Sequence, residues 1–178
     1  MNKWMKGLAA VVLVLAGGAA YFYWRISPKI PDQPFEKPSG RYAVGTREFV
    51  WTDAGRAETY TKDPADRRKI VVQVWYPAIA ATGAERAHYL MRPEEFASRS
   101  GARAARHART NSVLGAPVAP ADSAFPVLLY NHGGFWTRWS ATYITEWLAS
   151  HGYVVFSVEH FGFNQTVKYP DGSPFLLE

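Results

Sequence analysis

The chain has 178 residues, a formal net charge of +5 and no cysteine. Its length suits one domain with a hydrophobic core, and a content of 48% hydrophobic and 15% aromatic residues is typical of a globular protein. The lack of cysteine excludes disulfides, a cysteine nucleophile and a thiolate metal site, and the scattered lysines and arginines argue against nucleic acid as a partner.

An uncharged segment near the N-terminus is long enough to cross a membrane. It covers the 18 residues Gly7–Trp24, follows Lys3 and Lys6, and ends in an aromatic cluster. A membrane-spanning helix needs about 17 to 25 residues, and the lysines favour a cytoplasmic N-terminus. Residues 1–25 are therefore predicted to be a membrane anchor or, because the small residues 17–20 resemble a processing site, a cleaved signal segment. In both cases the domain lies outside the cytoplasm, either anchored to the membrane or secreted.

The segment after the anchor is rich in proline. Residues 26–40 contain four prolines, a composition that disfavours helix and predicts a semi-rigid extended spacer. The spacer would hold the domain, residues 41–178, away from the membrane.

The domain begins with a pattern typical of strands. Alternating polar and apolar side chains predict strands at Gly45–Trp51 and Ala57–Lys62, with a turn at 53–56 between them. A second turn at 63–66 leads to Lys69–Tyr76, which is rich in β-branched and aromatic residues and is followed by a proline. These segments predict an antiparallel entry to a sheet.

From residue 84 to 111 the composition changes to alanine and arginine. Pro93–Phe96 predicts the start of a helix, because proline is tolerated at the first helical position. Two interpretations of the arginines that follow remain open: a solvated helix surface, or a basic face that contacts lipid headgroups. These arginines recur at spacings of three or four, which places them on one helical face; they are Arg99, Arg103, Arg106 and Arg109. Residues 112–124, which follow, are predicted to be a loop.

The last predicted elements form a strand, helix and strand. Val127–Asn131 is a continuous apolar run, typical of a parallel strand buried on both faces. A helix over Trp139–Ser150 and a second strand over Tyr153–Val158 follow it. A βαβ unit of this kind is almost always right-handed, with its two strands parallel.

The first of these strands runs directly into His132-Gly133-Gly134. In acyl transfer the carbonyl oxygen becomes an oxyanion, and backbone N–H groups fixed after a strand stabilise it. One interpretation is therefore an oxyanion hole that uses the N–H groups of Gly133 and Gly134. The other is an ordinary strand-to-helix turn that contains two glycines.

Other polar residues offer weaker sites. Ser150 and Ser157 each lie near a histidine in the sequence, but side chains so close along a helix or strand do not usually face each other, so no self-sufficient triad is predicted. Ser157 is expected to be a buried core hydroxyl. His132, Glu159 and His160 follow two adjacent parallel strands, but without His-x-x-x-His spacing they are a weak metal signal, and no metal or cofactor is predicted. Instead, His132 is expected to hydrogen-bond the loop.

Several motifs together resemble the platelet-activating factor acetylhydrolase family of the plasma or isoform II type. The resemblance covers most of residues 40 to 165, and the combination is more specific than any one motif. The matching residues are Arg47, Asp53, Arg56, Val72–Pro77, Phe125-Pro126, His132-Gly133, Arg138, Leu148–Tyr153 and Val158-Glu159-His160.

The resemblance implies an α/β-hydrolase fold in which a Ser, Asp and His triad cleaves short or oxidised acyl chains from phospholipids without a metal. It also implies that the N–H of Gly134 is the first oxyanion-hole donor. One departure is Phe161-Gly162, where the family usually has Arg-Asp, which puts ion pairing there in doubt.

A larger departure is that no Gly-x-Ser-x-Gly occurs in the sequence. No nucleophile is identifiable, and the resemblance implies that this is only the N-terminal portion of a hydrolase, with the triad beyond Glu178. The α/β fold is then expected to stop after about the fourth strand. An apolar sheet edge would remain uncovered, and we expect it to cause instability or aggregation.

The predicted function is a carboxylic ester hydrolase for short-chain acyl esters or phospholipids, inactive as this chain alone. Its partners would be membrane lipid or a small ester substrate. Two alternatives remain: a dienelactone-hydrolase-like or general esterase, and a non-catalytic, membrane-anchored lipid-binding module.

Overall fold

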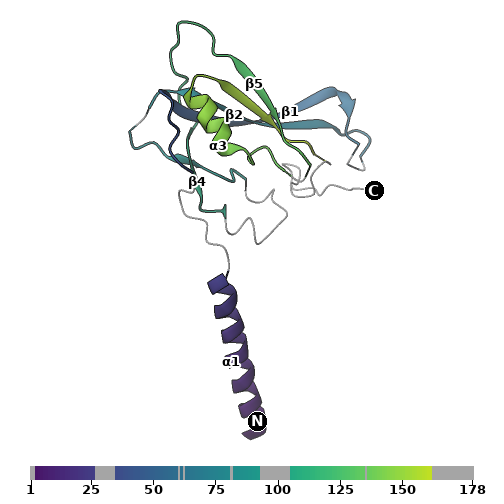
Figure 1. Cartoon of the computed structure of the whole chain (residues 1–178). Helices are drawn as coiled ribbons and strands as arrows, with labels where there is room; N and C mark the ends of the chain where they lie inside the picture. Colours follow the sequence, from purple (N-terminus) through teal and green to yellow (C-terminus); the bar gives the residue numbers. More distant parts are fainter. Residues whose placement is uncertain are drawn as a thin grey trace.

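The structure is a computed structural model in which a single helix stands apart from a mixed α/β domain (Figure 1). The domain is a curved sheet with helix α3 on one face. The described residues are 3–26, 35–59, 61, 63–80, 82–92, 105–134 and 136–161.

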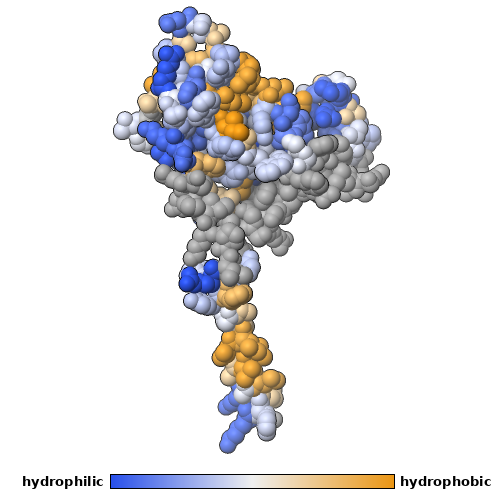
Figure 2. Space-filling view, in the orientation of Figure 1, coloured by the Kyte–Doolittle hydropathy of each residue, from blue (hydrophilic) through white to orange (hydrophobic). Residues whose placement is uncertain are grey.

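Helix α1 covers Lys3–Ile26 and matches the predicted apolar segment. Over Lys3–Arg25 it is long and apolar enough to cross a membrane, and this stretch does not pack against the domain. Figure 2 shows its apolar side chains exposed along the middle of the helix, with hydrophilic ones at its ends. A signal sequence has the same properties, so both sequence interpretations of this helix stay predictions.

The described sheet has six strands, whereas the sequence predicts an end after about the fourth. Their order across the sheet is β3-β4-β1-β2-β6-β5. The strands are β1 (Ala43–Ala57), β2 (Arg67–Ala78), β3 (Arg86–His88), β4 (Arg109–Leu114), β5 (Val127–Asn131) and β6 (Val154–Val158).

Strands β1 and β2 form a long antiparallel hairpin. The predicted turn at 53–56 is instead a bulge within β1, because Asp53 accepts hydrogen bonds from the Gly55 N–H (3.0 Å) and the Arg56 guanidinium (2.5 Å), after which Ala57 pairs again. The predicted strand Ala57–Lys62 is therefore wrong in its described part beyond Ala57. The second predicted turn is confirmed, with the Asp66 N–H donating to the Asp63 carbonyl at 3.1 Å.

Strands β3 and β4 overturn two predictions. Arg109 begins β4 and pairs with Glu85 at 3.0 Å, so it does not lie on a helical face. The predicted loop likewise starts too early, because 112–114 belong to β4. Pairing with β1 and β3 overrides the weak local pattern there. Arg106 lies in a turn, and Arg99 and Arg103 fall outside the described residues.

The predicted βαβ unit is confirmed. Strands β5 and β6 are parallel, with Val127 opposite Val154 and Asn131 opposite Val158. They are joined through α3, which begins at Thr142, three residues later than predicted, and ends at Ser150.

One property of β5 differs from the prediction. Because β5 is the last strand of the described sheet, Val127 and Leu129 are each 64% exposed rather than buried. The uncovered apolar edge that the sequence predicts is thus present among the described strands.

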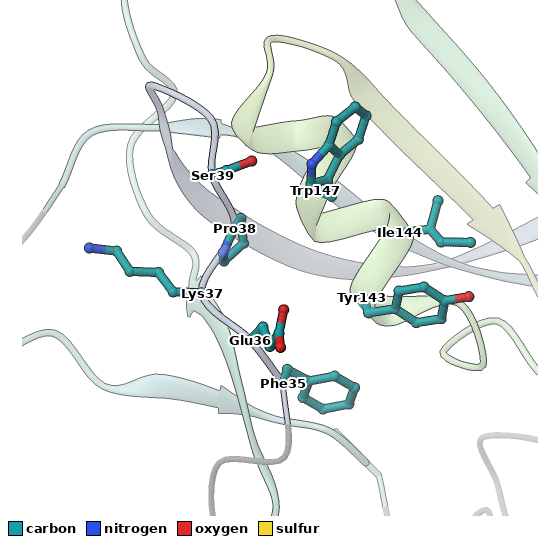
Figure 3. Close-up of a pocket in the computed structure, with 8 residues that line it drawn as sticks. All are labelled: Phe35, Glu36, Lys37, Pro38, Ser39, Tyr143, Ile144 and Trp147. Atoms are coloured by element: carbon teal, nitrogen blue, oxygen red, sulfur yellow. The ribbon is translucent and has the colours of Figure 1, made fainter.

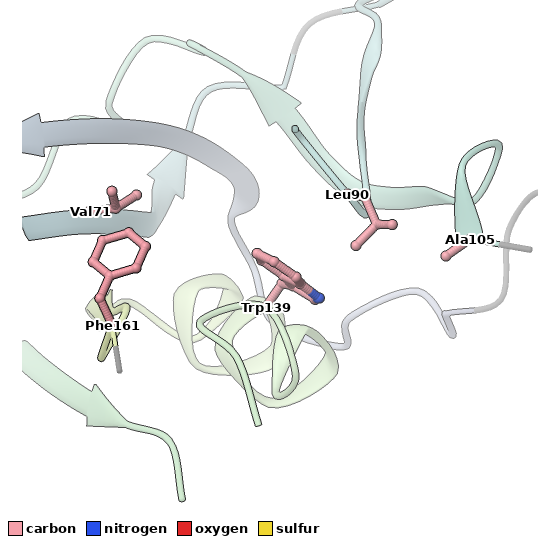
Figure 4. Packing of buried hydrophobic residues seen from close by; sticks show 5 residues of the cluster. All are labelled: Val71, Leu90, Ala105, Trp139 and Phe161. Carbon is pink, nitrogen blue, oxygen red and sulfur yellow. The ribbon is translucent and has the colours of Figure 1, made fainter. Parts of the chain in front are cut away.

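The core forms on both faces of β2, whose side chains alternate. Trp75 packs with Val44 and with Ala149 of α3. A second cluster joins Val71 to segments far apart in the chain, as Figure 4 shows; its members are Val71, Leu90, Ala105, Trp139 and Phe161. The opposite face of the sheet carries Val72, Val74, Tyr76, Ala78 and Ala116.

The exposed edge predicts that the chain associates with itself and that one charge added to β5 weakens this association. We expect the full chain in detergent micelles to associate as its concentration rises, and Leu129→Lys to weaken this, because a charge on an edge strand opposes pairing. Leu114→Lys is the matched control, because Leu114 is 59% exposed but lies on β4, which is paired on both sides. Sedimentation velocity measures the effect, and equal behaviour of the two variants would contradict it.

Candidate functional site

Two parallel strands end side by side and bring the predicted site residues together. Asn131 ends β5 and Val158 ends β6, and these two residues are opposite each other. His132 therefore lies beside Glu159 and His160. Open α/β sheets place ligands at the carboxyl ends of their strands, so this edge is the candidate site.

A buried chain of ion pairs supports this edge. The Arg138 side chain, 1% exposed, donates through Nη1 to Glu159 Oε2 at 3.1 Å and through Nη2 to Glu48 Oε2 at 2.6 Å. The backbone N–H of Arg138 also donates to Glu159 Oε2, at 3.1 Å. Arg92 Nε forms an ion pair with Glu48 Oε1 at 2.5 Å. Burial of charges is costly, and it is offset here because the guanidinium lies between two carboxylates.

His132 continues this chain to the loop. Its Nδ1 lies 2.9 Å from the Gly133 carbonyl oxygen, which accepts only, so Nδ1 carries a proton. Its Nε2 lies 3.1 Å from Glu159 Oε1. A ring protonated on both nitrogens donates to both acceptors, whereas a neutral ring protonated only at Nδ1 accepts at Nε2 from the backbone N–H of His160, at 3.1 Å. Although burial lowers the pKa of His132, the hydrogen bonds to Glu159 and to Gly133 raise it above its ordinary value.

Glu159 shows the opposite shift. Its burial alone would raise its pKa, but the hydrogen bond from His132 and the charge of Arg138 lower it below the usual glutamate value. Both groups are therefore charged between the lowered pKa of Glu159 and the raised pKa of His132. The stability that Glu159 contributes is present above its ordinary pKa and is lost as the pH falls through the lowered one.

The glycine loop is open on the side away from His132. The Gly133 carbonyl accepts from the Trp136 N–H at 3.2 Å, while no described group accepts from the N–H of Gly133 or Gly134. Gly133 is exposed, its φ is not positive, and an added Cβ would meet only Trp136 Cδ1, at 3.8 Å. Neither packing nor backbone strain requires glycine at position 133. Gly133 and Gly134 lie where the sequence places them, and their role as oxyanion donors stays a prediction.

His160 completes the edge without joining the ion pairs. Its Nε2 lies 3.0 Å from Asn131 Oδ1, and its ring centroid lies 4.9 Å from that of His132. Burial and the charge of His132 lower the pKa of His160. No metal-binding group of three His, Asp or Glu occurs in the part of the chain that the structure describes.

The two serines near histidines do not act as nucleophiles in this geometry. The Ser157 hydroxyl is buried and donates to the Arg138 carbonyl at 2.6 Å, which confirms it as a core hydroxyl. Ser150 Oγ does contact His151 Nδ1 at 3.1 Å, contrary to the expectation that such neighbours do not meet. However, the same Nδ1 lies 2.7 Å from the Trp147 carbonyl, so it carries the proton and cannot accept one from Ser150.

A cavity of about 760 Å³ lies away from this edge of the sheet, between α3 and the segment before β1 (Figure 3). Its lining includes one serine, Ser39, but no histidine to activate it. Its walls are mainly the apolar side chains of Phe35, Tyr143, Ile144 and Trp147. The cavity therefore lacks groups for acyl transfer.

Residues 30–169 match the sequence profile of the family described as platelet-activating factor acetylhydrolase, isoform II. A solved structure, that of a ferulic acid esterase from Streptomyces cinnamoneus, superposes with a TM-score of 0.63 at 28% sequence identity. The match covers 80% of this chain and 40% of that protein. No curated protein sequence is significantly similar. The α/β-hydrolase fold that the sequence predicts is thus confirmed.

The buried chain of charges predicts unequal costs for two glutamates. Glu159→Gln should lower the free energy of unfolding by about 3 kcal/mol, because it breaks a buried ion pair. The control Glu85→Gln should cost at most about 1 kcal/mol, because Glu85 pairs with Arg109 at the surface and is 81% exposed. Denaturant titration by tryptophan fluorescence compares them, and similar losses would refute the structural role of Glu159.

Proposed function

Because the chain belongs to the platelet-activating factor acetylhydrolase, isoform II, family, we propose that it supplies the oxyanion-binding part of a carboxylic ester hydrolase. The observation that carries this proposal is the Gly133–Gly134 peptide. It follows a parallel strand, Gly133 is exposed and Gly134 half-buried, and the Gly134 N–H has no acceptor among the described residues. An N–H so placed is suited to an oxygen that gains negative charge.

The proposed chemistry is acyl transfer. A nucleophile attacks the ester carbonyl, the carbonyl oxygen becomes negative, and the Gly134 N–H donates to it without prior rearrangement. Collapse of this intermediate expels the alcohol, and water then releases the acyl group. The 178-residue sequence contains no Gly-x-Ser-x-Gly, so the nucleophile of this scheme is not among its identifiable residues.

The substrate class proposed is a short-chain acyl ester or phospholipid. The family description supports an acetyl ester, and an apolar α1 would place the domain at a lipid surface outside the cytoplasm. A general esterase is the second candidate, because the similar solved structure is described as a ferulic acid esterase. The chain spans 40% of that protein's length. Acyl-chain profiling separates the two, since a general esterase also accepts larger acyl groups.

The scheme predicts that this chain alone does not turn over esters. Hydrolysis of p-nitrophenyl acetate by the purified chain should equal the buffer rate, because the oxyanion donor acts only on an attacked carbonyl. Binding to liposomes without hydrolysis would instead fit the lipid-binding module. Turnover that a serine-directed phosphonate abolishes would show that the chain holds its own nucleophile and would overturn the prediction.

A second prediction isolates the Gly134 N–H itself. A purification tag can be inserted in the exposed turn at Thr82-Gly83. The chain is then purified from its native host together with any polypeptide that is joined or bound to it. We expect phosphonate-sensitive hydrolysis of p-nitrophenyl acetate in this material. Gly134→Pro, which has no N–H, should lower kcat about 10²- to 10³-fold, while the control Gly134→Ala keeps the donor and most activity. Equal effects of the two changes would contradict the assigned donor.

A further inference from the structure

We propose that His132 is a positioning residue, which holds the Gly133–Gly134 peptide so that the Gly134 N–H points away from the ring and out of the loop. The inference rests on the proposed function for its significance, but its geometry stands on the described contacts alone. In this role His132 orients the loop and does not contact a substrate.

The first step is the geometry of one peptide unit. The Gly133 carbonyl and the Gly134 N–H belong to the same amide, and no described peptide bond is cis. In a trans amide these two groups point in opposite directions. His132 Nδ1 and the Trp136 N–H both donate to the carbonyl, at 2.9 and 3.2 Å. These two bonds therefore direct the Gly134 N–H to the opposite side, where no described group accepts from it.

The second step is that the ring itself is fixed at both ends. Nδ1 is bonded to the Gly133 carbonyl, and Nε2 faces the Glu159 carboxylate at 3.1 Å. The His132 residue is only 5% exposed, so water does not readily replace either partner. A rotation of the ring would break both contacts at once, and the loop is thus linked to β6 through a single side chain.

The third step is that Glu159 is fixed in turn. Arg138 donates to it through both its backbone N–H and its side chain, and the same guanidinium reaches Glu48 on β1. Sites held by packed strands are more precise than sites held by loops alone. The orientation of the glycine peptide is therefore set by two strands of the sheet rather than by the loop.

The contact between the ring and Glu159 depends on the protonation of His132. The charged ring donates to both Gly133 and Glu159. If the ring loses the Nε2 proton, Nε2 becomes an acceptor for the His160 N–H, which lies 3.1 Å away, and the bond to Glu159 is lost. The groups that face the ring are Glu159 and Arg138, with His160 beside it.

The direction of the pH effect follows from the raised pKa of His132. A group with a raised folded-state pKa gives its full stabilisation below its ordinary pKa and loses it as the pH rises through the raised value. The contact between the charged ring and Glu159 is therefore complete below the ordinary histidine pKa and persists until the pH passes the raised one. As the pH rises above the His132 pKa, Nδ1 keeps its proton and its bond to the Gly133 carbonyl, while the link through Nε2 changes from Glu159 to the His160 N–H.

The test is nuclear magnetic resonance on the full chain in detergent micelles, labelled with ¹⁵N at glycine and histidine. Gly133→Ala and Gly134→Ala assign the two loop amides. We expect both ring nitrogens of His132 to be protonated at pH 6, and the Gly134 amide shift to change with the same pH midpoint as the ring. A Gly134 amide shift that stays constant through the His132 titration would overturn the proposal.

Two substitutions separate positioning from a general loss of structure. In His132→Asn the amide nitrogen takes the place of Nδ1 and donates to the Gly133 carbonyl, so the Gly134 shift should stay near the wild-type value and lose its pH dependence. In His132→Gln the amide reaches toward Glu159 instead, and the Gly134 shift should move. Equal shifts in the two variants would refute the positioning role.

Distant glycines report whether each variant is folded. The amides of Gly45 in β1 and Gly152 after α3 should keep their shifts in both variants. If a variant unfolds, the wild-type titration still decides the question. No step measures ester hydrolysis, so failure of the positioning role appears in these spectra, whereas failure of the proposed function appears in the comparison of Gly134→Pro with Gly134→Ala.

Discussion

The ion pairs of Arg138 are the constraint on which the rest of this edge depends. One buried guanidinium bridges Glu48 on β1 and Glu159 after β6, and Glu159 in turn faces His132 after β5. Removal of any one partner would break a buried ion pair and disturb the charge balance of the interior, which costs far more than an exposed pair contributes. The ends of β5 and β6 are therefore held in one arrangement against β1, and the glycine loop takes its position from them.

The ion pairs fix the His132 ring, and the ring in turn fixes the Gly133–Gly134 peptide. The same carboxylate that pairs with Arg138 also raises the pKa of His132, and the ring holds a carbonyl whose amide partner has no acceptor among the described residues. Preorganised donors are effective because the reaction does not have to reorient them. In this chain the preorganisation comes from the packed sheet, so a substitution on β1 can affect a loop that it does not touch.

Some of this arrangement is readable in the sequence and some is not. The βαβ unit over 127–158 and the position of His132-Gly133-Gly134 follow from apolar runs and glycines, which are local signals. The role of Glu48 is not readable, because a glutamate in an alternating strand looks like any solvent-facing residue until its partner Arg138, 90 residues away, is known. The strand at 109–114 was missed for the same reason, since its partners are distant segments. The exposure of β5 depends on the order of the strands in space, which a sequence pattern does not contain.

The position of β6 in the sheet also determines when the sheet can be completed during synthesis. It lies between β2 and β5, yet it is the last of the described strands to leave the ribosome. Until it emerges, β5 has no neighbour in the described sheet and the hairpin of β1 and β2 lacks its second flank. Glu159 follows β6 immediately, so Arg138 and His132 gain the carboxylate that they share only after β6 has been synthesised. Insertion of this five-residue strand thus joins two separate pieces of sheet and brings Glu159 to Arg138 and His132 at the same time.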